Sequence, residues 1–599
     1  MIVIFAFMML YISPLLINCS KAFTLYPKNI PRYYDNYVDG LNIRQNIDQD
    51  QFPLRASDYQ GGYFLYAHPC ALLPSPFAGV LLLFDEITAD NLLWALLYIF
   101  GALSMFYLTR HVLNFNVWGA IFSSIIFGMN GHFAYLHHDG LNQARPTLLL
   151  PLLFAWILKA KENKIFIVLS ALLLALMSFE GALFIPIIVL FIFIFLLLES
   201  FSFENKKIAF DKTGPTILFY VCILAFLLSS VKTLPVLEYF GMDARSAQPY
   251  GLSYSEYVEG PNPLTDLYLY LFSAQNTGSG SMYMGYIPVI LCIFSFLVYF
   301  FEKRVWAMLL CLLLSIWLFW GPNQFFDLHK VLWHLPLFHE MQEIPKYYGL
   351  FILFFICIVS GKAFLFFDRY KKKFIINIGS CMLVVGVFLN LLLANIGYFN
   401  AFNTRLPLAK VSTHEFFQVI PLNFHPGNET IANPLHYFFK KENIGFIDTY
   451  DKFLHKTSII PKYFLLPQYG FLMPYTSLLV LPNPNYKGEV FFLKEDSQAN
   501  IEKFSHHELI INVKTNMPDI LVINQNYDKY WKTDRGEIIN NNGLLAVKFD
   551  DAVNSKICLQ FRPNIFFMGA IISIITLLGS LIYMLGNHPR FRCRIRQFK

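Results

Sequence analysis

The sequence predicts an α-helical polytopic membrane protein that carries a β-rich domain ahead of its last membrane-spanning helix. Of the 599 residues, 56% are apolar and only 14% are charged, and the mean hydropathy is +0.47. A soluble domain averages about 45–50% apolar and about 25% charged residues, so this chain has too little polar surface for a water-soluble fold. Apolar runs recur along the chain, and the stretch 396–564 that interrupts them is more polar and rich in β-forming residues.

The apolar runs set the number of expected helices. A membrane-spanning helix needs about 20 mostly apolar residues, and twelve runs reach or approach that length. They cover residues 2–18, 91–109, 115–135, 146–158, 165–179, 182–199, 215–233, 285–301, 305–321, 347–366, 374–395 and 565–586. The first run has no basic segment ahead of it, so we expect an uncleaved helix in place of a signal peptide.

Lys and Arg residues alternate between the two sides of these runs, which predicts the orientation. One set of short loops, with the C-terminal tail, holds nineteen cations: Arg110, Lys159, Lys161, Lys164, Lys206, Lys207, Lys212, Lys303, Arg304, Lys362, Arg369, Lys371, Lys372, Lys373, Arg590, Arg592, Arg594, Arg596 and Lys599. The alternate short loops hold only three: Arg145, Lys330 and Lys346. Cytoplasmic loops are enriched in Lys and Arg, so both termini are expected in the cytoplasm and the long segments 19–90, 234–284 and 396–564 outside. Such short clusters between apolar runs fit membrane orientation and not nucleic-acid binding.

These segments divide the chain into three expected parts. Residues 1–395 form a helical domain with outer loops, residues 396–564 a β-rich outer domain, and residues 565–599 the last helix with a basic cytoplasmic tail. Short, β-rich and partly alternating runs predict strands at 509–513, 520–524, 545–549 and 557–561.

The last part of the outer domain is expected to be a small antiparallel, sandwich-like β-domain. The run from Asn540 to Gly543 supplies a turn, because Asn and Gly tolerate positive φ. Tyr527, Tyr530 and Trp531 are expected in its core and not as a platform for a sugar ring, since aromatics of small β-domains more often fill the core.

Short motifs along the chain occur in an order that matches one family. They are Leu234 to Tyr239 followed by Ala244-Arg245-Ser246, Tyr283 to Tyr286 at a helix start, Asp519 to Val522 through Asn526-Tyr527, Trp531-Lys532 and Asn541 to Leu544, and Phe561-Arg562-Pro563 before the last helix. In this order they are similar to motifs of the YfhO family of bacterial membrane proteins, which belongs to the GT-C group of polytopic glycosyltransferases. The resemblance implies a GT-C-like helical domain and glycosyl transfer.

The first outer loop extends this resemblance. Asp39-Gly40-Leu41, Gln51 to Arg55 and Gly61-Gly62-Tyr63 look like the opening of related GT-C proteins, whose first outer loop supplies the catalytic carboxylate. One stretch departs from the pattern. Phe338 to Lys346 stands where the family often carries an Arg-rich motif, and Glu343 replaces an expected Arg. If that Arg grips a lipid phosphate, donor recognition here is altered or carried elsewhere.

Transfer from a polyprenyl-phosphate sugar needs a base for the acceptor hydroxyl, donors or cations for the leaving phosphate, and an apolar groove for the lipid. Asp35 and Asp39 follow the first helix on the outer side, so either is a candidate base. The resemblance favours Asp39 because of its Asp-Gly context. The alternative is that Asp39-Gly40 is an ordinary turn and that Asp35 only solvates the loop.

The loop from His137 to Arg145 is the densest polar cluster at an outer helix end. Arg145 with His137 and His138 is a candidate phosphate site. His138 with Asp139 is the alternative site of a divalent metal, although the three ligands that such a site needs at firm spacing are not visible. A headgroup-facing loop without a role fits the pattern equally well.

Other polar positions are weaker candidates. Glu180 flanks an outer turn and is expected to be solvated. Arg245 is a candidate phosphate ligand or a structural partner of Glu238. Lys346, at a helix start, is a candidate phosphate ligand or a side chain that snorkels to the membrane interface.

The combined interpretation is a membrane glycosyltransferase of a bacterial inner membrane. It would move a sugar from a polyprenyl-phosphate-linked donor to a cell-envelope glycan, lipid or protein on the extracytoplasmic face, with membrane lipids as further partners. A transporter or flippase of envelope lipids is the first alternative, and a non-catalytic scaffold is the second. No Lys, Arg, Asp or Glu lies near the centre of an apolar run, which disfavours ion-coupled transport.

Overall fold

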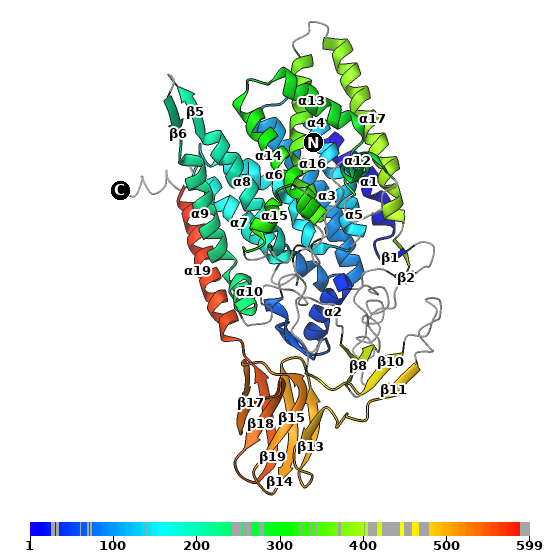
Figure 1. Ribbon diagram of the computed structural model, residues 1–599, viewed down its shortest axis with the longest axis vertical. Coiled ribbons are helices and arrows are strands. Elements are labelled where there is room, and N and C mark those ends of the chain that lie inside the picture. The colour runs from blue at the N-terminus through cyan, green and yellow to red at the C-terminus, as the bar shows by residue number, and fades with distance from the viewer. Residues whose placement is uncertain are drawn as a thin grey trace.

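The computed structural model describes residues 1–25, 30–31, 35–48, 50–59, 61–68, 71, 75–138, 140–204, 207–241, 254, 258, 265–274, 281–323, 325–335, 338, 341, 344–368, 373–400, 402–404, 416–421, 444–447, 458–466 and 479–587. A bundle of helices forms one end of the molecule and a β-sandwich forms the other, with the first outer loop between them (Figure 1). The last helix returns from the sandwich along the bundle (Figure 1).

A helix lies in each of the twelve apolar runs. These helices are α1 Ile2–Ile17, α3 Glu86–Tyr107, α4 Val117–Met129, α5 Gly131–His138, α6 Leu150–Lys159, α7 Ile165–Glu180, α8 Ile185–Ser200, α9 Thr213–Leu228, α10 Ser230–Gly241, α13 Tyr286–Val298, α14 Lys303–Trp320, α16 Ile344–Phe367, α17 Lys373–Asn400 and α19 Asn564–Asn587. In the described part of the chain, six helices are long and apolar enough to cross a membrane, or seven if the bent pair α9–α10 is one span. Twelve crossings therefore stay a prediction.

Shorter helical segments lie between these helices. They are α2 Asp35–Asp48, η1 Leu65–Ala67, η2 Pro76–Leu82, η3 Leu108–Val112, η4 Asn142–Leu149, η5 Ala182–Phe184, α12 Thr265–Phe272, η7 Gly321–Asn323 and α15 Leu328–Leu332.

Helix α16 lies at the centre of the bundle. Its most apolar stretch is 78% buried, whereas the corresponding stretches of α17 and α19 are only 28% and 22% buried. Phe351 of α16 stacks on Phe191 of α8 with 4.2 Å between ring centroids. A helix that is apolar on all sides must be buried or face lipid. Helix α16 is the buried case, and the outward apolar side chains of α17 and α19 fit the lipid-facing case.

Helices α9 and α10 meet at a break with a bend of 83°. The backbone N–H of Val231, just after the break, donates to Ser573 Oγ of α19 at 3.0 Å. The ammonium group of Lys232 is buried and donates to the carbonyl oxygens of His68 at 2.6 Å and Ala71 at 3.1 Å. A backbone N–H freed by a helix break, such as that of Val231, needs a partner in an apolar setting, while Lys232 ties the break to the first outer loop.

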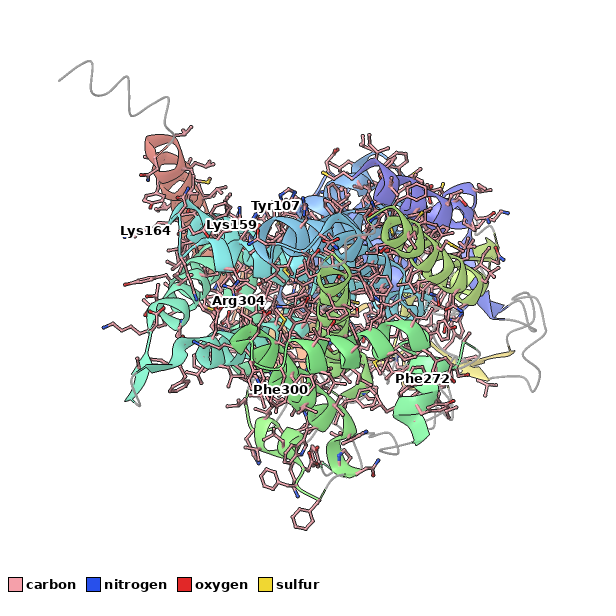
Figure 2. All side chains as sticks on the ribbon, turned by 90° about the horizontal axis from the view of Figure 1, so that it is seen from above. Tyr107, Lys159, Lys164, Phe272, Phe300 and Arg304 are labelled. Carbon is pink, nitrogen blue, oxygen red and sulfur yellow. The ribbon has the colours of Figure 1, made fainter. Side chains whose placement is uncertain are left out.

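Basic side chains gather at the end of the bundle opposite the β-sandwich. Figure 2 looks at that end from above and labels Lys159, Lys164 and Arg304 there. Glu199 accepts hydrogen bonds from Lys161 at 2.9 Å and from Arg304 at 2.6 Å. Glu199 thus connects two of the basic loops, 159–164 and 303–304, that the sequence assigned to the same side.

The β-sandwich consists of two four-stranded antiparallel sheets, in the strand orders β12-β15-β18-β17 and β13-β14-β19-β16. The strands are β12 Val490–Phe492, β13 Gln498–Phe504, β14 Glu508–Thr515, β15 Asp519–Asn526, β16 Trp531–Thr533, β17 Glu537–Asn541, β18 Leu544–Phe549 and β19 Val553–Phe561. The four predicted strands are confirmed. So is the turn, in which Asn542 and Gly543 have φ of 53° and 89°. Trp531 is 1% exposed and lies in the core, as expected.

A second β-region beside the sandwich was not predicted. Strands β8 Phe417–Pro421, β9 Ile444–Phe446, β10 Tyr463–Leu466 and β11 Leu479–Pro482 form a sheet in the order β11-β10-β8-β9, and β8 pairs in parallel with both β9 and β10. The antiparallel form predicted from the last part of the outer domain applies to the sandwich, while this sheet mixes parallel and antiparallel pairs. The boundaries of the β-rich domain stay a prediction.

The remaining strands are short. They are β1 Ala22–Leu25, β2 Ile30–Pro31, β3 Arg55–Ala56, β4 Tyr63–Phe64, β5 Phe201–Glu204, β6 Lys207–Phe210 and β7 Phe402–Thr404. Strand β1 pairs with β7, so the outer ends of α1 and α17 are tied together.

A buried carboxyl group joins the parallel-paired sheet to the sandwich. Asn524 of β15 exchanges hydrogen bonds of 2.8 Å with both backbone groups of Ile460 and donates to Glu489 at 3.3 Å. Tyr486 also donates to Glu489, at 3.0 Å. Burial raises the pKa of Glu489 to about 8, against the opposing effect of these hydrogen bonds and of Lys462.

This raised pKa predicts a pH dependence of stability. The folded chain holds a proton on Glu489 that the unfolded chain releases, so stability falls as pH rises from the unfolded pKa to the folded one and is constant above it. Between pH 6.5 and pH 9 we expect Glu489 to cost about 2 kcal/mol of stability. Thermal unfolding of the wild type and of Glu489→Gln, followed from pH 6.5 to pH 9, measures this loss of stability. Parallel pH profiles for the two proteins would refute the prediction.

Candidate functional site

Helix α2, which carries both predicted catalytic carboxylates, is fixed between the bundle and the sandwich. A Cβ placed on Gly40 would lie 2.9 Å from Cβ of Glu86, so only glycine allows α2 to pack this closely on the start of α3. Ile43 enters a hydrophobic core that also contains Leu521, Leu545 and other residues of the sandwich. Figure 1 shows α2 between the two parts.

The predicted catalytic residues lie in the first half of α2. Asp35 begins the helix and Asp39 lies one turn later, while their side chains lie outside the described residues. Asp39-Gly40 is thus part of a helix, and the alternative that this pair forms a turn is wrong. Glycine is required there for packing, a reason that the dipeptide alone does not reveal.

Arg44, one turn after Gly40 on the same face of α2, also holds the helix in place. Its guanidinium donates to the carbonyl oxygen of Leu81 at 2.9 Å and lies 3.8 Å from the carboxylate of Glu86. It also donates to the carbonyl oxygen of Phe84. Helix α2 is therefore tied to η2 and to the start of α3.

Three of the predicted binding residues, His137, His138 and Lys346, lie on helix α5 or beside it. His137 stacks on Trp94 of α3 with 4.6 Å between ring centroids. His138 meets Tyr398 of α17 edge to face at 5.2 Å. Tyr135 lies under the ammonium group of Lys346, 5.9 Å from its ring centroid, at the start of α16. We call His137, His138 and Lys346 the α5 cluster.

The metal alternative rests on a residue that the structure does not describe. Asp139 lies outside the described residues. Within the described part of the chain, no group of three or more His, Cys, Asp or Glu side chains is placed to hold a metal ion.

Arg145 forms a buried ion network beside the α5 cluster. Its guanidinium is 0% exposed and donates to Asp90 at 2.8 Å and to Glu180 at 3.0 Å and 3.1 Å. Ser75 of the first outer loop donates to the other oxygen of Glu180. The expectation that Glu180 is solvated is wrong, because α7 turns its last residue inward toward Arg145.

This network changes the interpretation of Arg145. Three of its five N–H donors bind two carboxylates, whose negative charge disfavours a phosphate at the same guanidinium. The network joins α3, η4, α7 and the first outer loop, and it acts as a structural connection between them. Asp90 was missed because it lies just before an apolar run and looks like a boundary residue in the sequence.

The predicted residues of the second outer segment are only partly visible. Arg245 lies outside the described residues, so its pairing with Glu238 is not tested. Glu238 instead accepts hydrogen bonds from Lys529 and Tyr530 of the sandwich. The end of α10 is therefore attached to the outer domain.

A second buried arginine links the first outer loop to the sandwich. Arg55 is 2% exposed, donates to Gln525 at 3.0 Å, and lies 5.0 Å from the ring centroid of Trp531. Burial lowers the pKa of Arg55 to about 10, and the charges of Asp528 and Asp58 oppose this shift.

Two histidines complete this contact. His507 accepts from the backbone N–H groups of Leu54 and Arg55 at 3.1 Å and 3.2 Å. Burial lowers the pKa of His507 to about 3, so the ring is neutral at neutral pH. His506 lies 2.7 Å from Ser57 Oγ. The motif from Gln51 to Arg55 thus docks the loop on the sandwich, a role that sequence analysis missed.

Comparison with known proteins gives only distant similarities. No protein-family model matches the chain, and no curated protein matches it. Among solved structures, the arabinofuranosyltransferase AftD from Mycobacteria aligns over 69% of this chain and 29% of its own, with 13% identity and a TM-score of 0.43. The Archaeoglobus fulgidus oligosaccharyltransferase, in complex with Zn and sulfate, aligns over 74% of this chain and 62% of its own, with 11% identity and a TM-score of 0.41. The chain thus spans less than two thirds of either protein, and similarity at this level assigns no function.

Proposed function

We propose that this chain is a membrane glycosyltransferase that uses a polyprenyl-phosphate-linked sugar donor. One observation carries the proposal: α2, with Asp35 and Asp39, is fixed between the outer ends of apolar helices and a β-sandwich. A boundary between apolar helix ends and an outer domain is a place that an acceptor from water and a donor whose lipid tail stays in the bilayer can both reach. The motif resemblance, which favours Asp39, supports the same assignment.

The reaction assigns a role to each part of the site. Asp39 takes the proton of the acceptor hydroxyl, whose oxygen forms a bond to the anomeric carbon of the sugar. The bond between that carbon and the phosphate oxygen breaks, and its electron pair leaves with the phosphate. Lys346, His137 and His138 stabilise the charge that develops on the phosphate. Arg145 positions the surrounding helices.

The proposed location follows from the charge distribution. The basic end of the bundle lies in the cytoplasm of a bacterial cell, and the β-sandwich lies on the outer face of the inner membrane. The acceptor is a glycan, lipid or protein of the cell envelope. The exposed apolar faces of α17 and α19 contact membrane lipids.

One observation favours a second candidate, a flippase of envelope lipids. The α9–α10 break is a discontinuous helix with a buried cation, and transporters often bind substrate at such breaks. A flippase needs no catalytic base. It would retain activity in Asp39→Asn and lose it in Lys232→Met, whereas a transferase loses activity in Asp39→Asn.

The test of the transferase proposal is sugar transfer in isolated membranes. With a radiolabelled polyprenyl-phosphate sugar as donor, Asp39→Asn is expected to lower the transfer rate at least about 100-fold, because a general base contributes on this scale. Asp48→Asn, at the exposed end of the same helix, is the matched control and should keep wild-type activity. Undiminished transfer in both Asp39→Asn and Asp35→Asn, at normal protein levels, would overturn the proposal.

A further inference from the structure

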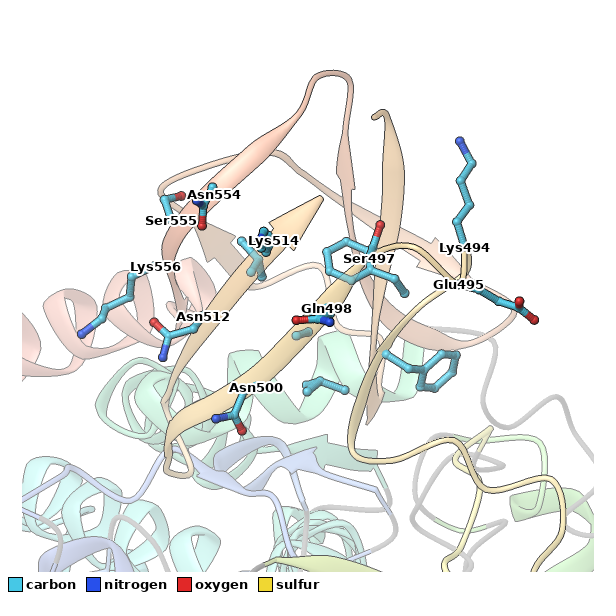
Figure 3. Close-up of a pocket in the computed structure, with 15 residues that line it drawn as sticks. Lys494, Glu495, Ser497, Gln498, Asn500, Asn512, Lys514, Asn554, Ser555 and Lys556 are labelled. Carbon is cyan, nitrogen blue, oxygen red and sulfur yellow. The ribbon is translucent and has the colours of Figure 1, made fainter. Parts of the chain in front are cut away.

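The outer face of the sandwich contains a wide concavity with a volume of about 790 Å³. Strands β13, β14 and β19 form its floor, and the segment around β12 forms one wall (Figure 3). Its labelled lining is polar, and Figure 3 shows Gln498, Asn500, Asn512, Lys514 and Asn554 on these three strands. This site does not contain any residue of the proposed transfer reaction.

The strand register arranges the floor in two rows. Gln498 pairs with Lys514, which pairs with Asn554 on the other side. In the next row, Asn500 pairs with Asn512, which pairs with Lys556. All six side chains are exposed. Neighbouring strands lie about 4.8 Å apart, so the six side chains form a grid of about 10 Å by 7 Å.

Amides dominate this grid, which is unusual for the solvent face of a sheet. Asn is depleted in strands, so Asn500, Asn512 and Asn554 occupy positions where a β-branched residue would favour the fold. Residues whose intrinsic propensity disfavours the structure around them concentrate at functional sites. Exposed sheet faces more commonly carry pairs of opposite charge. The same sheet has such a pair beside the grid, where Lys503 and Glu508 lie 2.6 Å apart.

The chemistry of the grid matches hydroxyl-rich ligands. A side-chain amide has two N–H donors and a carbonyl acceptor, and a sugar hydroxyl can donate and accept at once. One donor of Asn512 is used by Glu502 at 3.1 Å, which leaves its second donor and its acceptor for a ligand. Lys514 adds a cation, while the charge of Lys556 is balanced by Glu502 at 2.6 Å. A surface that binds acidic peptides would carry several unbalanced cations, and this grid holds only one.

We propose that this concavity is a binding site for a carbohydrate chain, separate from the site at α2. The amides of the two rows bind hydroxyl groups of successive sugar residues, and Lys514 binds a polar or acidic substituent. The site holds a glycan on the outer domain, apart from the transfer reaction.

The test is binding of oligosaccharides to the full-length protein in lipid nanodiscs. The probes are maltohexaose, chitohexaose and a hexamer of galacturonic acid, with polyaspartate as the non-sugar polyanion. At least one sugar probe is expected to bind, and the double variants Gln498→Ala/Asn554→Ala and Asn500→Ala/Asn512→Ala should each weaken it at least about 10-fold. Asn516→Ala, an exposed amide on the loop after β14, is the matched control.

The following results distinguish the carbohydrate site from an acidic-peptide site and from the transferase proposal. Absence of amide-dependent binding for all three sugars overturns the proposal, provided that the variants unfold at the wild-type temperature. Binding of polyaspartate that depends on Lys514 and not on the amides also overturns it and indicates an acidic peptide partner. Asp39→Asn should keep full oligosaccharide binding. If that variant also keeps its transfer activity, the transferase proposal fails while the carbohydrate site stands.

Discussion

Arg145→Ala is expected to lower the free energy of unfolding by about 3–5 kcal/mol, the usual cost of removing one partner from a buried ion pair. The guanidinium is fully buried and holds Asp90 and Glu180. Without it, two carboxylates remain in an apolar environment with little water to solvate them. The four segments that meet at Arg145 would separate, because each contributes a group to the network.

The matched control for this variant is Arg304→Ala. Arg304 also pairs with a glutamate, at 2.6 Å, but its side chain is 48% exposed, so the loss should be at most about 1 kcal/mol. Unfolding by SDS in mixed micelles measures both variants. Adding Asp90→Asn and Glu180→Gln to Arg145→Ala should restore much of the stability, since the uncompensated charges are then removed. Equal losses in Arg145→Ala and Arg304→Ala would show that the network contributes no more than a surface pair.

Gly62→Ala is expected to separate the first outer loop from the sandwich. Gly62 has φ of 92°, which costs an alanine about 1–2 kcal/mol. Its Cβ would lie 1.8 Å from Nη2 of Arg55, and that guanidinium has little room to move because Trp531 and Phe561 pack against it. The hydrogen bond to Gln525 would break, so we expect a total loss of about 3 kcal/mol or more.

Limited proteolysis measures this separation directly. In Gly62→Ala, sites in the first outer loop should be cleaved at least about 10-fold faster than in wild type, because local opening becomes more frequent. Gly79→Ala, in η2 of the same loop, is the matched control, since a Cβ there meets nothing within 4 Å. If cleavage of Gly62→Ala and Gly79→Ala is the same, the Arg55 contact does not hold the loop.

The sequence by itself determined the local structure of this protein. Each apolar run became a helix, and the alternation in residues 509–513 became strand β14, because side-chain periodicity acts within one element. The bias of Lys and Arg assigned loops 159–164 and 303–304 to the same side, and Glu199 pairs with cations of both. His137, His138 and Lys346 were predicted at outer helix ends, but not as residues on and beside one helix, α5.

Only the tertiary structure decided which of these elements meet. Arg145 and Glu180 looked like a phosphate ligand and a solvated acid, and their pairing depends on how α7 and η4 pack. Arg55 and Gln525 are 470 residues apart in the chain, and no local pattern connects them. The parallel pairing of β8 and the close packing of Gly40 on Glu86 also depend on contacts between segments that are far apart in the chain. Burial, and with it the partner of each charge, is a property of the packed chain, because it depends on neighbours that the sequence does not place next to each other.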